Sequence, residues 1–557
     1  MSEKLTTSRR RKVLRLAGLG PLSGLLAGYA ALTVAELVSA GVRPEASPVI
    51  AVGGATIDRT PAPVKDWAIR HFGTDDKLVL QLGILAVLTL LALALGIVAA
   101  RHRRTGAAGV LLFGLVGALA ATGRPDSTSA TDALPSVAGA VAGAALLHWL
   151  AGRLPQCARP ATPRGPARES EAMDTGPAAR IDALADRGGE DGRDGWDRRG
   201  FVIAATAAAA ASTGVGALGR SLNAARGRSA IASRNRIVLP APASAAAPIP
   251  ERAALRVAGI GRFITPNHDF YRVDTALVVP RIDATSWSLR IHGRGVTRGM
   301  TLSYQDLLRM PLIERDITLT CVSNEVGGPY AGNARWLGVR LADLLAQRGV
   351  KPPSKGGPAD QLVARSVDGM TIGTPVEDVM DGRDAMLALG MNGQPLPFEH
   401  GFPARMVVPG LYGFVSACKW IKEIELTTFD DYDPYWVKRN WARKAPIKTE
   451  SRIDTPKPFA RPKAGTVMIA GVAWAQHRGI DKVEIRVDDG PWHEAELAAE
   501  DTRDTWRQWS FPWQALPGSH TLTVRATDRT GETQPERRTR TIPDGASGWH
   551  SVVINVD

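Results

Sequence analysis

A cysteine followed by a glycine-rich segment is the part of this 557-residue chain with the clearest chemical content. An apolar run from Ile317 leads into Cys321, and the segment GGPYAGN occupies 327–333. Glycine lets backbone pass close to a bulky ligand, and loop N–H groups can turn toward an anion. The pattern predicts a strand ending at Cys321, a loop, and an amphipathic helix from about Val339. Cys321 is then either a metal-binding thiolate or a buried unreactive cysteine.

A second stretch, LPFEHGFPARMVVPGLYGFVSACKW (396–420), supports the first reading. Together the two stretches resemble the sulfite oxidase family of molybdopterin enzymes. The family patterns C-x-x-N, G-N-x-x-W-x-G-V-x-L, L-P-x-x-H-G-x-P-x-R-x-x-V-P-G and K-W-I occur in order at Cys321–Asn324, Gly332–Leu341, Leu396–Gly410 and Lys419–Ile421. The resemblance extends from about Arg262 to the C-terminus.

The resemblance implies a molybdenum–molybdopterin cofactor, an anionic ligand whose sulfur atoms hold the metal. A thiolate is a soft donor suited to such a metal, and the family pattern gives this role to Cys321. Arg405 and Lys419 would supply positive charge for the cofactor phosphate. The other cofactor-binding residues implied by the resemblance are Asn267, His268, Tyr271, Arg272, Thr374, His400 and Ser416, the last together with backbone N–H groups of 413–417. We expect Cys418, the competing thiol, to pack in the core.

The chain departs from the family beside the metal. Sulfite oxidases carry an arginine that contacts the oxyanion directly after the C-x-x-N run, whereas this chain has Glu325. A carboxylate there would repel sulfite by several kcal/mol at a separation of ~4 Å. Trp441 falls near the place of a family tyrosine. We therefore doubt sulfite as the substrate, and we expect Glu325 and Tyr330, a possible proton donor, to act with Cys321 as catalytic residues.

Composition excludes several other classes of site. The formal net charge is +13, but Lys and Arg are widely spread, so nucleic acid is not an expected partner. The three cysteines Cys157, Cys321 and Cys418 lie far apart without a C-x-x-C. This spacing argues against c-type haem, an iron–sulfur cluster and a disulfide framework. His148 is the clearest histidine in an apolar run, and one histidine is too few for haem b.

The first part of the chain predicts a membrane domain. Five apolar runs are near spanning length: Val13–Ala40, Leu78–Ala100, Ala107–Ala121, Ala133–Leu150 and Phe201–Leu218. A buried soluble helix is the alternative for the third and fifth. Positive flanks predict a cytoplasmic N-terminus and an extracytoplasmic segment after Leu218. Arg198 and Arg199 before the alanine-rich fifth run resemble a twin-arginine signal, or else an ordinary stop-transfer flank.

The predicted fold is multidomain. We expect membrane helices over 1–152, a disordered cytoplasmic linker over 153–197, a fifth span over 198–220 and a second linker over 221–252. An α+β molybdopterin domain over 253–450 and an immunoglobulin-like β-sandwich over 451–557 follow. Five alternating segments between 467 and 556 predict the strands of this sandwich.

The expected function is a multi-pass plasma-membrane oxidoreductase with an extracytoplasmic molybdopterin site, transferring an oxygen atom or two electrons to or from a small molecule other than sulfite. A sulfoxide reductase of the methionine sulfoxide type is the alternative chemistry, and a non-catalytic membrane-tethered binding protein is the alternative class. The expected partners are the lipid bilayer, a membrane or external electron-transfer protein and a second copy of the chain. A transporter is disfavoured because the spans carry little charge.

Overall fold

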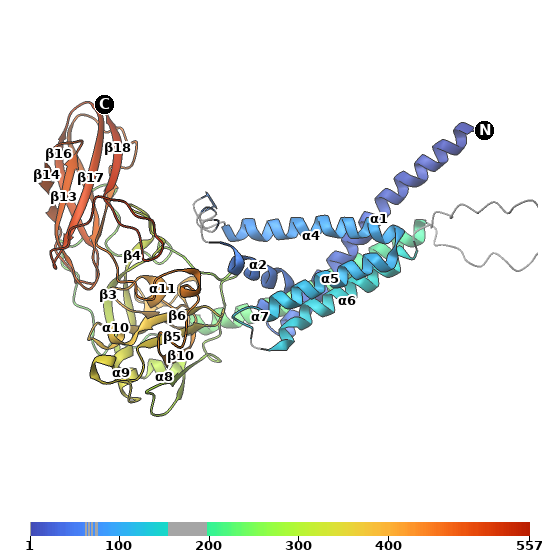
Figure 1. Cartoon of the computed structure of the whole chain (residues 1–557), viewed down its shortest axis with the longest axis horizontal. Helices are drawn as coiled ribbons and strands as arrows, with labels where there is room; N and C mark the ends of the chain where they lie inside the picture. Colours follow the sequence, from blue (N-terminus) through green and yellow to red (C-terminus); the bar gives the residue numbers. More distant parts are fainter. Residues whose placement is uncertain are drawn as a thin grey trace, which may run out of the picture. The chain divides into compact units, whose positions relative to one another are not determined.

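The computed structural model describes residues 2–61, 64, 67, 71–72, 76–127, 129–153 and 198–557. It divides into two compact units, Met1–Ala224 and Ala225–Asp557. Figure 1 shows the first unit as long helices and the second as sheets with short helices. The expected cytoplasmic linker lies outside the described residues, apart from Arg153.

Long helices make up the first unit, and their composition suits a membrane. They are α1 (Ser2–Gly41), α2 (Pro48–Arg59), α4 (Asp76–Arg101), α5 (Arg103–Thr122), α6 (Leu134–Ala151) and α7 (Arg198–Asn235), with the short 3-10 helices η1 (Pro44–Ala46) and η3 (Ala130–Ala133). Among the described residues, five segments are long and apolar enough to cross a membrane: Leu19–Gly41, Lys77–Arg101, Arg103–Thr122, Ala130–Ala151 and Gly200–Asn235. Each of them overlaps one of the five apolar runs of the sequence.

Small residues let these helices approach one another closely. A Cβ atom on Gly24 of α1 would lie 1.9 Å from the Ala92 carbonyl oxygen of α4. A Cβ atom on Gly139 of α6 would lie 2.4 Å from the Ala31 carbonyl oxygen of α1. Glycine is therefore required at both crossings, as in helix pairs held by close backbone packing.

Helix α7 extends beyond the expected fifth membrane span. We predicted a span ending at residue 220 and a linker over 221–252, but α7 continues to Asn235. The added segment SLNAARGRSAIASRN contains several alanines and arginines, which favour helix. It contains no proline, and the next proline along the chain is Pro240. The low hydrophobicity of this segment suggested a linker, but its helix propensity favours the helical backbone that the structure shows.

The catalytic half of the second unit is built on two sheets. Their strand orders are β2-β1-β10-β5-β6 and β3-β4-β7-β8, with β9 added to β7. The strands are β1 (Ser288–Gly293), β2 (Met300–Ser303), β3 (Leu312–Thr320), β4 (Ala331–Arg340), β5 (Gln361–Ser366), β6 (Thr371–Pro375), β7 (Met386–Met391), β8 (Gln394–Pro395), β9 (Arg405–Val407) and β10 (Ile421–Thr427). The helices are α8 (Tyr304–Leu308), α9 (Leu341–Ala346), α10 (Val376–Met380) and α11 (Gly413–Ser416), with 3-10 helices η4 (Pro353–Lys355), η5 (Phe398–His400) and η6 (Val437–Arg439).

The connection between β3 and β4 carries the cysteine motif of the sequence. The two strands pair antiparallel up to Thr320 and Ala331, so residues 321–330 form the hairpin connection and Cys321 directly follows β3. The helix expected from about Val339 begins at Leu341, because Val339 still pairs with Leu312 in the sheet. The order of a strand leading into Cys321, a loop and a later helix agrees with the prediction, with β4 between the loop and helix α9.

Two further sheets form the C-terminal part. Their orders are β11-β12-β16-β15 and β14-β13-β17-β18. The strands are β11 (Glu450–Thr455), β12 (Gly465–Trp474), β13 (Ile480–Val487), β14 (Trp492–Glu494), β15 (Glu496–Leu497), β16 (Arg507–Ala515), β17 (Gly518–Asp528) and β18 (His550–Val556). Ile469 and Trp509 of the first sheet share one buried cluster with Val483, Leu522 and Ile554 of the second. The two sheets therefore pack face to face, and the five predicted strands are present.

Candidate active site

Cys321 is buried at the end of β3, with 8% of its surface exposed. Its N–H donates to the Tyr330 carbonyl at 2.9 Å, and its Sγ accepts from the Ser323 N–H at 3.4 Å. Burial raises the pKa of this thiol, while the Ser323 N–H and the charge of Lys419 oppose the increase. A metal cation at the sulfur would favour the thiolate in the same pocket.

Asn324 closes the loop between the two strands. Its Oδ1 accepts from the Tyr330 N–H at 2.7 Å, and the Glu325 carbonyl accepts from the Gly328 N–H at 2.7 Å. Glu325 is exposed and Tyr330 is half-buried at the two ends of this turn. Asn324 was not among the predicted site residues. Its place as the last residue of the C-x-x-N pattern could have identified it.

An aromatic cluster stands beside the cysteine loop. The Phe270 ring stacks on Tyr271 at 5.1 Å and meets Trp336 and His400 edge-on at 5.8 and 5.5 Å between ring centroids. A Cβ atom on Gly332 would lie 2.8 Å from the Phe270 ring, so a glycine is needed there. The cluster joins the predicted residues Tyr271 and His400 to two aromatic residues that sequence reasoning did not assign to the site.

His400 is a neutral hydrogen-bonding group. It is 3% exposed, and its Nε2 lies 2.9 Å from the Asn267 carbonyl oxygen. A carbonyl only accepts hydrogen bonds, so Nε2 carries the proton. Burial lowers the pKa of His400 to about 4, so the ring is uncharged at neutral pH. Asn267 in turn accepts from the Asn392 side chain at 2.8 Å.

Arg405 places a positive charge in the interior. It is 5% exposed; its Nη1 donates to the His400 carbonyl at 3.2 Å, and the guanidinium lies 5.0 Å from the Trp336 ring centre. Its Nε atom is buried without a hydrogen-bond partner, and no carboxylate lies within ion-pair distance in the described part of the chain. Burial lowers the pKa of Arg405 to about 10. The charge of Arg405 lies close enough to Tyr271 to affect its ionisation, as does Cys321.

Lys419 has a different environment from the one expected. Its Nζ lies 2.8 Å from Asp274 Oδ2, donates to the Glu399 carbonyl at 3.2 Å, and lies 4.6 Å from the Trp420 ring centre. Asp274, 145 residues away in the chain, already balances its charge. Sequence reasoning missed this carboxylate, since no local pattern connects the two residues.

Four other predicted residues do not direct their polar groups into this cluster. The Thr374 hydroxyl donates to the Val415 carbonyl, and the Ser416 hydroxyl bonds the Leu411 and Tyr412 carbonyls at 2.9 and 3.0 Å. Both hydroxyls therefore stabilise the α11 region, in place of the anion contacts expected for them. The side chain of His268 is 80% exposed beside Asp269, and Arg272 is exposed. Cys418 is fully buried, as expected for a packing residue.

A cleft of about 510 Å³ opens beside the cysteine loop. Its lining includes Arg262 and Asp269 of the catalytic half, Gly328 of the loop, and Arg452, Lys457 and His550 of the C-terminal part. Cys321, His400 and Arg405 do not line it. The cleft therefore lies next to the buried cluster and shares the 327–331 segment with it.

Arg452 ties the C-terminal part to the loop. Its Nη1 donates to the Gly328 carbonyl at 2.9 Å, and its Nε pairs with Asp454 at 2.7 Å. The His550 ring accepts from the Ile453 N–H at 3.0 Å, and a Cβ atom on Gly327 would lie 2.2 Å from that ring. The loop conformation thus depends on two residues more than 100 positions away.

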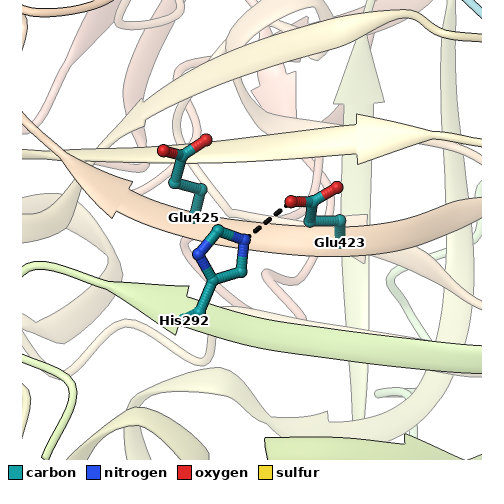
Figure 2. Close-up of side chains that lie close together, drawn as sticks. All are labelled: His292, Glu423 and Glu425. Atoms are coloured by element: carbon teal, nitrogen blue, oxygen red, sulfur yellow. Dashed lines mark hydrogen bonds and ion pairs between the residues drawn. The ribbon is translucent and has the colours of Figure 1, made fainter. Parts of the chain in front are cut away.

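A second cluster contains side chains of the types that bind metal ions. Among the described residues, one group of three ligand-type side chains comes together, His292, Glu423 and Glu425 on β1 and β10. Figure 2 shows His292 pointing at Glu423, 2.6 Å away. Arg290 and Arg365 lie 2.8 and 3.5 Å from Glu423, so arginines already balance these carboxylates. We assign this group to an ion-pair network. Within the part of the chain that the structure describes, Cys321 belongs to no such group, so a metal there would take further ligands from a cofactor or from solvent.

Comparison with known proteins identifies the family. The model of the oxidoreductase molybdopterin binding domain matches residues 276–436, and that of the Mo-co oxidoreductase dimerisation domain matches 445–557. An uncharacterized oxidoreductase of Bacillus subtilis (strain 168), YuiH, is 33% identical over 159 residues, which cover 28% of this chain and 74% of that protein. The chain belongs to the sulfite oxidase family of molybdopterin-dependent oxidoreductases.

Two other relatives of this chain differ from each other in activity. Mitochondrial sulfite oxidase of Mus musculus is 30% identical over 345 residues, covering 53% of this chain and 62% of that protein. Nitrate reductase (NADH) 1 of Oryza sativa subsp. japonica is 28% identical over 355 residues, covering 53% of this chain and 38% of that protein. The chain therefore spans less than two thirds of either protein, and its helical unit lies outside the matched domains.

The residues at the site fit the family's cofactor. The buried Arg405 Nε and Asn324 Nδ2 are both hydrogen-bond donors without a partner among the described residues. Buried donors of this kind are costly unless a ligand or water accepts from them. An oxygen-rich anion such as molybdopterin would satisfy both, and Cys321 would add the protein's sulfur to those of the cofactor.

Proposed function

We propose that this protein is a membrane-anchored oxidoreductase that transfers an oxygen atom, or two electrons with their protons, at a molybdenum held by molybdopterin and Cys321. The observation that carries the proposal is the pair of buried side chains Cys321 and Arg405, each of which lies close enough to Tyr271 to affect its ionisation. The family membership supplies the identity of the cofactor. When bound, the cofactor supplies the change of metal oxidation state that the side chains cannot.

The protein's own residues would bind and orient the cofactor. Arg405 offers a buried charge and an unpaired N–H to an anionic group, in a pocket where electrostatic attraction is strong. Neutral His400 fixes the Asn267 backbone. Phe270 and Trp336, both buried, exclude water from the same wall. Tyr330, half-buried beside Tyr271, is our candidate proton donor to the substrate.

The substrate is proposed to be a small molecule other than sulfite. Glu325 is exposed on the loop in the place where sulfite oxidases have an arginine, and its negative charge disfavours a dianion. The cleft lined by Gly328 and Arg452 is the proposed route of approach. A neutral sulfoxide, including that of methionine, satisfies the charge requirement, and its reduction is the second candidate chemistry.

The helical unit is proposed to anchor the enzyme in the plasma membrane as five spans. The positive flanks of the spans support a cytoplasmic N-terminus and an extracytoplasmic catalytic domain. Arg198 and Arg199 before the alanine-rich part of α7 support twin-arginine export. An external or membrane electron-transfer protein would then exchange electrons with the site.

We propose domain boundaries at 253–450 for the molybdopterin domain and 451–557 for an immunoglobulin-like domain. The two packed sheets support the second assignment, and the match to a dimerisation domain supports a homodimer.

The experiment measures turnover of the purified full-length protein in both directions. Reduced viologen serves as electron donor with dimethyl sulfoxide or methionine sulfoxide, and ferricyanide serves as acceptor with sulfite. We expect little sulfite oxidation in the parent and a gain of sulfite oxidation in Glu325→Arg. Sulfoxide reduction by the parent would favour the second candidate chemistry. Molybdenum-loaded protein that is inert in every assay would favour the alternative of a membrane-tethered binding protein.

A further inference from the structure

A buried carboxyl group lies at the junction of the catalytic and C-terminal parts. Glu450, the first residue of β11, is 2% exposed, and neither of its carboxyl oxygens has a hydrogen-bond partner among the described residues. An ionised carboxylate in such a place is costly, so the neutral acid is favoured. Burial raises the pKa of Glu450 to about 8, although the charges of Lys448 and Arg452 oppose the increase.

Strand alternation directs Glu450 toward the catalytic half. Its neighbours Thr449 and Ser451 bond Asp528 and Gln534 of the C-terminal part at 2.8 and 2.7 Å. Successive residues of a strand point to opposite faces, so Glu450 points the other way. Trp474, directly opposite Glu450 in the β11–β12 pairing, accordingly belongs to the core of the catalytic half.

Other buried polar atoms on this side also lack partners. The Trp474 Nε1 donor and the Gln476 Oε1 acceptor have no hydrogen bond among the described residues. Unpaired donors and acceptors buried together are normally satisfied by ordered water. Because Glu450 offers a carboxyl proton and two oxygens next to Trp474, the region has the polar groups that water molecules need.

This region reaches the Cys321 end of β3. Gln476 donates through Nε2 to the Thr318 carbonyl and the Thr320 hydroxyl, each at 3.0 Å, and Thr320 precedes Cys321. Buried Tyr412 lies within electrostatic reach of both Glu450 and Cys321, since each of these groups raises the pKa of its hydroxyl. Tyr412 therefore lies near both the acid and the proposed metal ligand, and Gln476 contacts the strand that leads to that ligand.

We infer that Glu450 exchanges protons with the redox site through internal water between β11, Gln476 and Tyr412. The inference rests on the proposed function. Reduction of a substrate oxygen to water consumes two electrons, from the external electron-transfer protein, and two protons; the reverse reaction releases both. In the first direction the Glu450 carboxylic acid gives one proton toward the site and becomes a carboxylate; it is reprotonated from solvent and gives the second proton in the same way.

The groups that face this acid modulate its ionisation. Lys448 and Arg452 favour the carboxylate, but Lys448 is paired with Asp544 at 2.9 Å and Arg452 with Asp454 at 2.7 Å. Neutral Tyr412 adds no charge at physiological pH because its pKa lies well above 10.0. With a pKa of about 8, the Glu450 carboxyl changes protonation in the slightly alkaline range.

The test follows the carboxyl group and the metal separately in the molybdenum-loaded full-length protein. Infrared spectroscopy records the band of a protonated carboxyl between pH 6 and 9, and EPR redox titration records the molybdenum midpoint potential over the same range. The variants are Glu450→Gln, with Glu450→Asp as a second acid at the same place. Glu496→Gln, in exposed β15, is the matched control.

We expect a carboxyl band that disappears near pH 8 and changes when the metal is reduced, together with a break in the pH dependence of the potential at the same pH. Both should vanish in Glu450→Gln, persist in Glu496→Gln, and move to another pH in Glu450→Asp. If Glu450→Gln binds molybdenum and the pH dependence of its midpoint potential keeps the same break, the inference is overturned but the proposed function is not. Absence of molybdenum from the parent as well overturns the proposed function, and this inference with it.

Discussion

Replacing Arg405 with methionine separates the cost of a buried charge from its use in cofactor binding. Burial lowers the pKa of Arg405 from 12.5 to about 10, so the charged side chain destabilises the folded state at every pH below 10. The difference corresponds to a penalty of about 3 kcal/mol. Methionine has a similar length and no charge, so it removes this penalty in the cofactor-free protein.

Part of that gain is offset by contacts that the variant loses. The hydrogen bond to the His400 carbonyl contributes about 1 kcal/mol and the contact with Trp336 about 1 kcal/mol. The net expectation is a cofactor-free Arg405→Met protein more stable by about 1 kcal/mol, or about 2 °C in melting temperature. In the loaded protein the sign reverses, because a charge-assisted bond of about 1.5–3 kcal/mol to the cofactor is lost. Cofactor affinity should fall by about 10- to 100-fold.

The assay compares melting temperatures of protein made with and without molybdopterin synthesis in the host, and measures release of pterin on dilution. Arg309→Met, at a side chain that is 77% exposed, is the control and should change neither value. If Arg405→Met destabilised the cofactor-free protein as much as the loaded one, the residue would be a structural cation, and its assignment to the cofactor would be refuted.

Three further changes have defined outcomes. Gly338→Val places a Cβ atom 2.1 Å from the Leu387 carbonyl where β4 pairs with β7, so soluble expression and melting temperature should fall sharply; a normal melting curve would contradict the close packing. Arg452→Gln removes the bond to the Gly328 carbonyl, and KM should rise several-fold with less effect on kcat; unchanged KM would show that the loop holds itself. For Glu450, the folded-state pKa of about 8 exceeds the ordinary 4.5, so its stabilising effect is complete below pH 4.5 and is lost as pH rises through 8. The advantage of Glu450→Gln in thermal melting should therefore grow from pH 5 to pH 8, reaching about 3 kcal/mol near pH 7; an advantage that does not vary with pH would contradict a buried acid.

Sequence reasoning predicted much of the fold because the signals are local. Apolar runs predicted the five long helices α1, α4, α5, α6 and α7, but not α2, and alternation predicted C-terminal strands. The segment 221–235, expected as part of a linker, is instead the C-terminal part of α7, since it contains good helix formers although it is polar. The helix expected from Val339 starts at Leu341, because pairing with Leu312 extends the strand.

Motifs of the sequence indicated several candidate site residues, whereas partners from distant parts of the chain were missed. Cys321, His400 and Arg405 stand in ordered patterns of the family, and the structure places them in one buried region. The partner of Lys419, Asp274, lies 145 residues away with no pattern to mark it. Glu450 reads as an ordinary strand residue, and its burial depends on the packing of the C-terminal part against the catalytic half.

The most direct test of the central claim measures molybdenum and pterin per chain, with molybdenum EPR, in the full-length protein and in two matched variants. Cys321→Ser removes the proposed ligand, and Cys418→Ser changes the other buried cysteine in the catalytic half. We predict near-stoichiometric molybdenum and pterin in the parent and in Cys418→Ser, and an altered EPR signal in Cys321→Ser. An unchanged signal in Cys321→Ser would contradict the ligand assignment, and absence of pterin from all three proteins would contradict the enzyme itself.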